Sequence, residues 1–139
     1  MDYRDEGQVR TLVYGECYAE SLAGIKDPEE PFTLEQMKML TEEDVDVGYN
    51  PIPRLRITWK PTNPACTCAV NIGLCIRYKL MMDFPDSPFK VDIFVREGSH
   101  TSAQEVDKQV NDKERVAAAL ENPDILQLVT TCINYVSSS

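Results

Sequence analysis

The chain has 139 residues, of which 42% are hydrophobic and 27% charged, so we expect one globular domain rather than a disordered chain. A formal net charge of −9 makes nucleic acid a poor direct partner, because the phosphate backbone favours clustered lysine and arginine. No stretch approaches 18 uninterrupted apolar residues, and the charged start MDYRDEGQVR is not typical of a signal peptide, so no membrane span is expected. The single domain is expected over residues 1–139, with 1–10 and 137–139 disordered.

The chain contains five cysteines, an odd number, and is large enough to form a core without disulfides. In the absence of an export signal, this cysteine usage indicates reduced thiols in the cytoplasm or the nucleus. Each cysteine is therefore considered as a core residue, a reactive thiol or a metal ligand.

The first predicted element is a helix near the start of the chain. Apolar residues between Val13 and Ile25 recur at near-helical intervals, which predicts a first helix ending before Asp27-Pro28. Cys17 falls on the apolar face of this helix and is therefore expected in the core.

Between this helix and residue 60 the sequence predicts a short turn and a hairpin. Thr33 and Gln36 form a capping box, which predicts a brief helical turn. Apolar and polar residues then alternate in 45–47 and in 55–59, and GYNPIP between them is typical of a connection. These two runs are predicted to pair as a β-hairpin.

A second helix is predicted after the hairpin, because Asn63 is a favourable N-cap and Pro64 suits the first helical position. This helix is expected to bury one face of apolar residues at helical spacing. The residues of this stripe are Ala65, Ala69, Ile72, Ile76 and Leu80.

One strand and two more helices are predicted in the second half. Alternation predicts a strand at 91–95, Ser102 opens a long helix that stops near Asn122-Pro123, and helical spacing predicts a docked last helix over Asp124–Val136. The resulting order, α-β-β-α-β-α-α, implies an α+β fold. It would have a small mixed or antiparallel sheet with helices packed on one face.

Three cysteines, Cys66, Cys68 and Cys75, lie close together in the sequence and raise the question of a metal site. On a helix, nine residues place Cys66 and Cys75 on opposite sides, while seven residues separate Cys68 from Cys75 by about 10 Å along the axis. A zinc–sulfur bond is about 2.3 Å long, so one ion cannot reach these thiols without breaking the helix. Cys68 and Cys75 are therefore interpreted as core residues, as is Cys132 on the last apolar face.

Cys66 differs from these because it falls in the first turn after the predicted Asn63 cap, off the apolar stripe. The helix dipole favours a thiolate there, but it contributes only about 1 kcal/mol, which is less than one pKa unit. His100 or Lys60 could supply a cation through the fold. Two interpretations stay open, a reactive thiol and a partly buried cysteine near the cap.

No motif of a known enzyme class accompanies Cys66. The sequence contains no G-x-S-x-G, phosphate-binding glycine loop, HExxH or CxxC motif. A Cys–His hydrolase also needs an orienting third group and an oxyanion hole, and nothing marks either. His100 is interpreted either as a surface or capping histidine or as a support for Cys66. We therefore expect that the protein is not an enzyme.

Several segments match the motifs of one known family. They are Asp27-Pro28-Glu29, Thr33-Leu34-Glu35, Pro61-Thr62 before Cys66, the segment IGLCIR at 72–77, and above all NDKERVAAALENP at 111–123. Together they resemble the cytosolic iron–sulfur assembly component 2 family, which includes the Galla proteins and has SufT- and PaaD-like bacterial relatives. The resemblance extends from about Glu20 to Cys132.

The resemblance implies an α+β fold and a role in late cytosolic iron–sulfur protein maturation, in the cytoplasm and also the nucleus. Family members join a WD40 propeller protein and a HEAT-repeat adaptor, and pass clusters to client apoproteins such as DNA helicases. The family's reactive cysteine falls on Cys66, which implies transient binding of a metal or iron–sulfur cluster and no stably bound cofactor. Asp27, Glu29 and His100 match family motifs and are expected to support Cys66, and family members can form homodimers.

The longest motif supplies the expected partner-binding residues, which are Asn111, Asp112, Lys113, Glu114 and Arg115. Near Cys66 the chain departs from the family, with Ala65 in place of histidine, Cys68 in place of an apolar residue and Val70 in place of threonine. Loss of the adjacent imidazole weakens the argument for an activated thiolate at Cys66.

The sequence is consistent with three functions of different classes. The favoured function is a component of the targeting machinery that delivers clusters through Cys66 and protein contacts. The alternative is an interaction adaptor in cell-division, chromosome-segregation or polarity complexes, in which Cys66 is incidental. A thiol enzyme is the third. Replacing Cys66 with serine separates the first two, because only the first predicts a loss of client cluster content.

Overall fold

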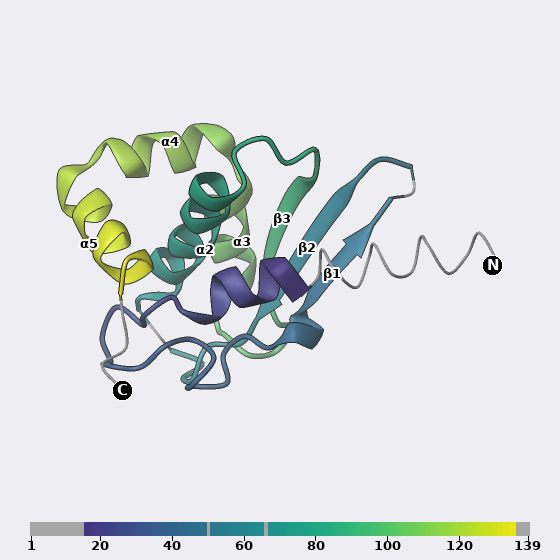
Figure 1. Cartoon of the computed structure of the whole chain (residues 1–139). Helices are drawn as coiled ribbons and strands as arrows, with labels where there is room; N and C mark the ends of the chain where they lie inside the picture. Colours follow the sequence, from purple (N-terminus) through teal and green to yellow (C-terminus); the bar gives the residue numbers. More distant parts are fainter. Residues whose placement is uncertain (1–15, 50, 66, 136–139) are drawn as a thin grey trace.

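The structure, a computed structural model, describes residues 16–49, 51–65 and 67–135 (Figure 1). Its described elements, in chain order, are a helical segment at 16–23, the 3-10 turn η1 (Glu42–Asp44), β1 (Val45–Gly48), β2 (Arg54–Trp59), α2 (Ala69–Asp83), β3 (Lys90–Val95), α3 (Ala103–Asn111), α4 (Lys113–Glu121) and α5 (Pro123–Ile133). This arrangement confirms the predicted α+β class, with one predicted helix divided into two. The termini expected to be disordered lie outside the described residues.

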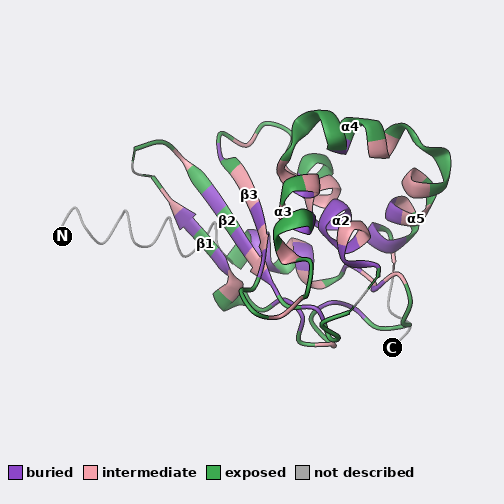
Figure 2. Ribbon diagram, turned by 180° about the vertical axis from the view of Figure 1, so that it is seen from behind, coloured by how far each residue is buried: buried purple, intermediate pink, exposed green. Residues whose placement is uncertain are grey.

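The sheet is mixed and has the strand order β1-β2-β3. β1 pairs antiparallel with β2, from Val45 opposite Ile57 to Gly48 opposite Arg54, which confirms the predicted hairpin. β3 pairs parallel with β2, because α2 crosses over between them. Buried and less buried residues alternate along the strands, so one face of the sheet carries the core (Figure 2).

The core lies between this face and the helices, with α2 at the centre. α2 packs against β3, α3 and α5. Four residues of the predicted apolar stripe, Ala69, Ile72, Ile76 and Leu80, are buried, as helical spacing predicts. Each fully buried Ile or Leu side chain contributes about 1.5–3 kcal/mol to stability.

The start of α2 differs from the prediction. The helix begins at Ala69 rather than at Pro64. The Asn63 side chain does accept a hydrogen bond from the Ala65 N–H, at 2.9 Å, but the Pro64 carbonyl accepts from the Thr101 N–H, also at 2.9 Å. The Pro64 carbonyl thus accepts a hydrogen bond from a distant loop, whereas in a helix it would accept from the N–H group four residues later. The segment forms turns, and Ala65 is exposed.

The long helix predicted after Ser102 is two helices. α3 begins after Ser102, as predicted, but ends at Asn111. Asp112 then has an extended backbone (φ −88°, ψ 117°), and its carboxylate caps α4 by accepting from the N–H groups of Glu114 and Arg115, at 2.9 and 3.4 Å. Apolar spacing continues across this corner, which is why periodicity does not predict it.

Two smaller predictions have opposite outcomes. Thr33 and Gln36 make both capping-box hydrogen bonds, at 2.8 and 3.2 Å, as predicted. Cys17 is exposed, and its predicted burial is wrong. The other described members of the predicted face, Ala19, Leu22 and Ile25, are buried, and Tyr18 is buried in place of Cys17.

α5 confirms the docked last helix, which ends at Ile133 rather than extending to the end of the predicted range. Val129, Cys132 and Ile133 are buried, whereas Val136 lies outside the described residues. In the part of the chain that the structure describes, no helix is both long enough and apolar enough to cross a membrane.

Candidate functional site

The predicted reactive thiol, Cys66, lies outside the described residues, but its loop is described on both sides. The neighbouring residues Ala65 and Thr67 are exposed. Thr101 holds this loop to the loop before α3, because its N–H and its hydroxyl both donate to the Pro64 carbonyl, at 2.9 and 3.2 Å. α2 begins three residues after Cys66, so the helix start on which the dipole argument depended is wrong.

His100 belongs to the loop that holds the cysteine loop. Its Nδ1 accepts a hydrogen bond from the Ser102 N–H at 2.9 Å, which assigns the proton of a neutral ring to Nε2. This contact agrees with the first of the two interpretations of His100, that of a surface or capping histidine. The neighbouring residue Thr101 bonds to Pro64, so the histidine and cysteine loops lie side by side. Support of Cys66 by His100 stays a prediction.

Asp27 forms a turn against the end of α5. Only 4% of the residue is exposed, and its Oδ1 accepts from the N–H groups of Glu29 and Glu30, at 2.8 and 3.0 Å. The adjacent Lys26 N–H donates to the Cys132 carbonyl at 3.0 Å. The Glu29 side chain is exposed, so its backbone is the part engaged in the turn. The structure therefore gives Asp27 a turn-forming role.

Cys75 and Cys132 form a buried thiol pair where α2 meets α5. The pKa of Cys75 is raised far above its ordinary value, because its S–H donates a hydrogen bond to Cys132 and because it is buried. Cys68 is also buried, so all three are core residues, as predicted. Among the described residues, no group of three or more Cys, His, Asp or Glu side chains is arranged to hold a metal ion.

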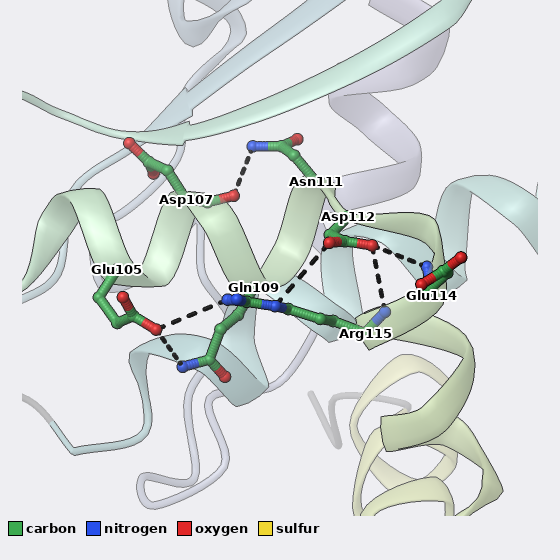
Figure 3. Close-up of polar contacts among 7 residues, drawn as sticks. All are labelled: Glu105, Asp107, Gln109, Asn111, Asp112, Glu114 and Arg115. Atoms are coloured by element: carbon green, nitrogen blue, oxygen red, sulfur yellow. Dashed lines mark hydrogen bonds and ion pairs between the residues drawn. The ribbon is translucent and has the colours of Figure 1, made fainter.

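The NDKER motif forms the corner between α3 and α4 (Figure 3). The Asn111 Nδ2 donates to the carbonyls of Asp107 and Ile93, at 2.8 and 2.7 Å. Its Oδ1 accepts from the Ile93 N–H and from Arg77 Nη2, each at 2.9 Å. The two amide hydrogens and the two acceptor positions of the Asn111 side chain are thus all used inside the protein.

The remaining residues of the motif face solvent. Asp112 caps α4, while Lys113, Glu114 and Arg115 are exposed. Arg115 reaches back to Glu105 at 3.6 Å and to Asp112 at 3.8 Å (Figure 3), and exposed ion pairs of this kind contribute only about 0–1 kcal/mol. The three exposed residues are the part of the motif that a partner can reach, and their role in binding stays a prediction.

Arg77 links three elements in a way that helical spacing did not predict. Its Nε donates to the Val110 carbonyl at 2.5 Å, and its Nη2 donates to the Val91 carbonyl at 3.0 Å and to Asn111. Burial lowers the pKa of Arg77, although a guanidinium stays charged at neutral pH. One sequence signal could have indicated that Arg77 links these elements: it is an arginine beside the buried Ile76 on a central helix.

Curated proteins similar to this chain carry names from one family. The chain is 46% identical to Protein AE7-like 1 of Arabidopsis thaliana over 131 residues, covering 94% of this chain and 80% of that protein. It is 44% identical to Cytosolic iron-sulfur assembly component 2B of Dictyostelium discoideum, covering 96% of this chain and 76% of that protein. It is 38% identical to MIP18 family protein galla-1 of Drosophila melanogaster, covering 96% of this chain. The chain belongs to the MIP18 family.

Membership in the MIP18 family confirms the resemblance to the cytosolic iron–sulfur assembly component 2 proteins and to Galla. The chain spans 60% of the length of galla-1. No protein-family model matches the chain. The roles expected for Cys66 and for the NDKER motif rest on residue matches and stay predictions for this MIP18 protein.

Proposed function

We propose that this chain is a component of cytosolic iron–sulfur protein assembly that helps deliver clusters to client apoproteins through protein contacts and Cys66. The observation that carries the proposal is its MIP18 family membership. Relatives in Mus musculus and Dictyostelium discoideum, 40% and 44% identical, are named Cytosolic iron-sulfur assembly component 2B. That name supports the cytosol as the compartment in which the chain works.

The chemistry of the cargo supports a transient role for Cys66. Iron–sulfur clusters are held by cysteine thiolates, typically four for each cluster. One reactive cysteine supplies a single ligand, so a cluster in transit would need further thiolates from a partner or a client. The loop around Cys66 suits such an encounter, because Ala65 and Thr67 are exposed and Thr101 fixes the position of Pro64.

Protein contacts are the second part of the proposal. By resemblance to the family, the partners would be a WD40 propeller protein and a HEAT-repeat adaptor. Lys113, Glu114 and Arg115 are exposed at the start of α4 and would contribute to these contacts. Charged residues at the rim of an interface act mainly on the rate and specificity of association. The chain would have no catalytic turnover of its own.

The decisive experiment replaces Cys66 with serine in cells that lack the endogenous protein. We expect ⁵⁵Fe incorporation into client proteins to fall, while the variant still co-purifies with its partners. Cys17→Ser, which changes an exposed thiol on the helical segment at 16–23, should leave incorporation normal.

Two outcomes would contradict the proposal in different ways. If incorporation depends on the chain but is unaffected by Cys66→Ser, Cys66 is incidental and the chain acts as an interaction adaptor. If clients load normally without the chain, it has no part in cluster assembly.

A further inference from the structure

The face of the sheet opposite the core carries a patterned set of charges. The strand residues that point to the core, such as Ile57 and Ile93, are buried beneath the helices. The alternate residues are exposed or half-buried, and Figure 2 shows this alternation along the strands. We call them the outer face, which consists of Asp46, Arg54, Arg56, Thr58, Lys90, Asp92 and Phe94.

The first row of the outer face holds two cations and no carboxylate. The strand register places Arg54 opposite Lys90, with Gly48 on the other side of Arg54. Neighbouring strands lie about 4.8 Å apart, so two like charges stand side by side, which destabilises a sheet. Within the described ranges, no ion pair joins either cation to a carboxylate. An anionic partner would relieve this repulsion.

The next two rows add an aromatic surface. Arg56 stands between Asp46 and Asp92 in the register, and its guanidinium carbon lies 5.3 Å from the centroid of the Phe94 ring. This cation–π contact holds Phe94 half-exposed beside Thr58. Thr58 lies four residue steps along β2 from Arg54, so the cationic row and the apolar row lie about 13 Å apart.

At the far end of the same face, a cation is paired with a carboxylate. Arg96, which follows β3, forms an ion pair with Asp44, the residue before β1. Among the described residues no carboxylate forms such an ion pair with Arg54 or Lys90, although the whole chain carries a net charge of −9. An acidic protein has many carboxylates with which its cations can pair. Two adjacent cations that pair with none of the described carboxylates are therefore suited to bind the carboxylates of a partner.

We propose that the outer face is a docking surface for an acidic, partly apolar segment of another protein. Carboxylates of the segment would lie against Arg54 and Lys90, and an apolar side chain would lie against Phe94. A nucleic acid fits this face less well, because two cations are few for backbone binding. Its evenly charged backbone would also continue from Arg54 and Lys90 past Asp46 and Asp92, whereas the segment would carry its carboxylates only at the first row. This surface does not involve Cys66 or the NDKER motif, so the inference is independent of the proposed function.

The test uses the full chain and a short fluorescein-labelled peptide with paired glutamates followed by a tryptophan. Fluorescence anisotropy should show binding that weakens as salt is added. In the ¹⁵N-labelled protein, the largest amide shifts should fall in β2 and β3. A peptide with lysines in place of the glutamates should not bind.

Matched charge reversals locate the binding site. Arg54→Glu with Lys90→Glu should weaken peptide binding about tenfold or more, since like charges would then face each other across the interface. Lys38→Glu with Lys108→Glu makes the same change in net charge at exposed positions outside the outer face, and should leave affinity unchanged. Arg54→Gln with Lys90→Gln removes the cations without adding repulsion and should also weaken binding. This variant provides the test if the reversal variant fails to fold.

Three results would overturn the proposal. The acidic peptide does not bind, or both double reversals weaken it equally, or a single-stranded oligonucleotide of the same length binds more tightly. The last result would identify the outer face as a nucleic-acid surface instead.

Discussion

The side chain of Asn111 pairs with the backbone of Ile93 as a neighbouring strand would. Its Oδ1 accepts from the Ile93 N–H at 2.9 Å and its Nδ2 donates to the Ile93 carbonyl at 2.7 Å. One turn earlier on α3, the Asp107 carboxylate accepts from the Val95 N–H at 2.8 Å. α3 therefore covers the outer edge of β3 with side chains, where an open edge would offer unpaired backbone groups to other chains.

Replacing Asn111 with alanine is expected to lower the free energy of unfolding by about 2–4 kcal/mol, because the buried N–H and C=O groups of Ile93 lose their partners. Asn111→Asp keeps the acceptor but turns its second oxygen toward the carbonyls of Ile93 and Asp107, so it should also destabilise the protein. Urea denaturation followed by circular dichroism measures both. Gln109→Ala, at a half-buried position on the same helix, removes only an exposed hydrogen bond to Glu105 and should change stability by less than about 0.5 kcal/mol. Equal effects from Asn111 and Gln109 would contradict the edge-covering role.

Gly73 lets α2 and α3 approach closely. A Cβ atom at this position would lie 2.6 Å from Val110 Cγ1, and Val110 is fully buried with little freedom to move. Gly73→Ala should therefore destabilise the protein by about 1–3 kcal/mol, although alanine favours a helix by about 1 kcal/mol. Thermal or urea denaturation measures the change. Gly24→Ala, where no atom lies within 4 Å of the added Cβ, is the control.

A double-mutant cycle tests the Gly73 contact directly. Val110→Ala removes the methyl group that clashes, so Gly73→Ala should cost less in that background than in the native chain. Purely additive effects would show that the close approach does not decide the result.

Asp107 is expected to make the stability of the protein depend on pH. Burial raises the pKa of Asp107, against the opposing effect of its hydrogen bond from the Val95 N–H. Between its unfolded pKa, about 3.9, and the higher folded value, the folded state binds more protons than the unfolded state. The contribution of Asp107 to stability therefore falls as pH rises through this window.

Asp107→Asn keeps an acceptor for Val95 and removes the charge, so the variant should lose less stability than the native chain as pH rises through the window. At neutral pH it should be at least as stable. Urea denaturation at a series of pH values measures this, with the exposed Asp86→Asn as control. An unchanged pH dependence in Asp107→Asn would assign the effect to other groups.

The elements that sequence could predict are those with local causes. Alternation in 45–47 and 55–59 produces the hairpin, and helical spacing from Ala69 to Leu80 produces the buried face of α2. Long-range contacts decide the rest. The start of α2 depends on Thr101 bonding to Pro64, and the α3–α4 corner is accompanied by contacts between Asn111 and β3.

In the candidate site too, local features could be predicted from the sequence and long-range contacts could not. Cys66 and His100 could be singled out by residue type and motif, and the burial of Cys75 followed from helical spacing. The roles of Arg77 and Asp107 could not be predicted, because each depends on backbone groups of a strand that is distant in sequence.

Cys75 and Cys17 are expected to differ strongly in their reaction with iodoacetamide. Alkylation requires both access and thiolate, and Cys75 has neither, since it is fully buried and its pKa is raised by hydrogen bonding and burial. Cys17 is exposed and should label quickly, and Cys66 should also label well before Cys75. Mass spectrometry of briefly labelled native protein measures all three.

Substitution extends this prediction to stability. Cys17→Ser should leave the unfolding free energy nearly unchanged, whereas Cys75→Ser places a hydroxyl in apolar surroundings and should cost about 1–3 kcal/mol. In Cys75→Ser the hydroxyl can still donate to Cys132, so Cys75→Ala tests whether that hydrogen bond reduces the cost. If Cys75 labels as fast as Cys17 in the folded protein, α2 and α5 separate in solution on the timescale of labelling. The thiol pair would then not be part of a closed core.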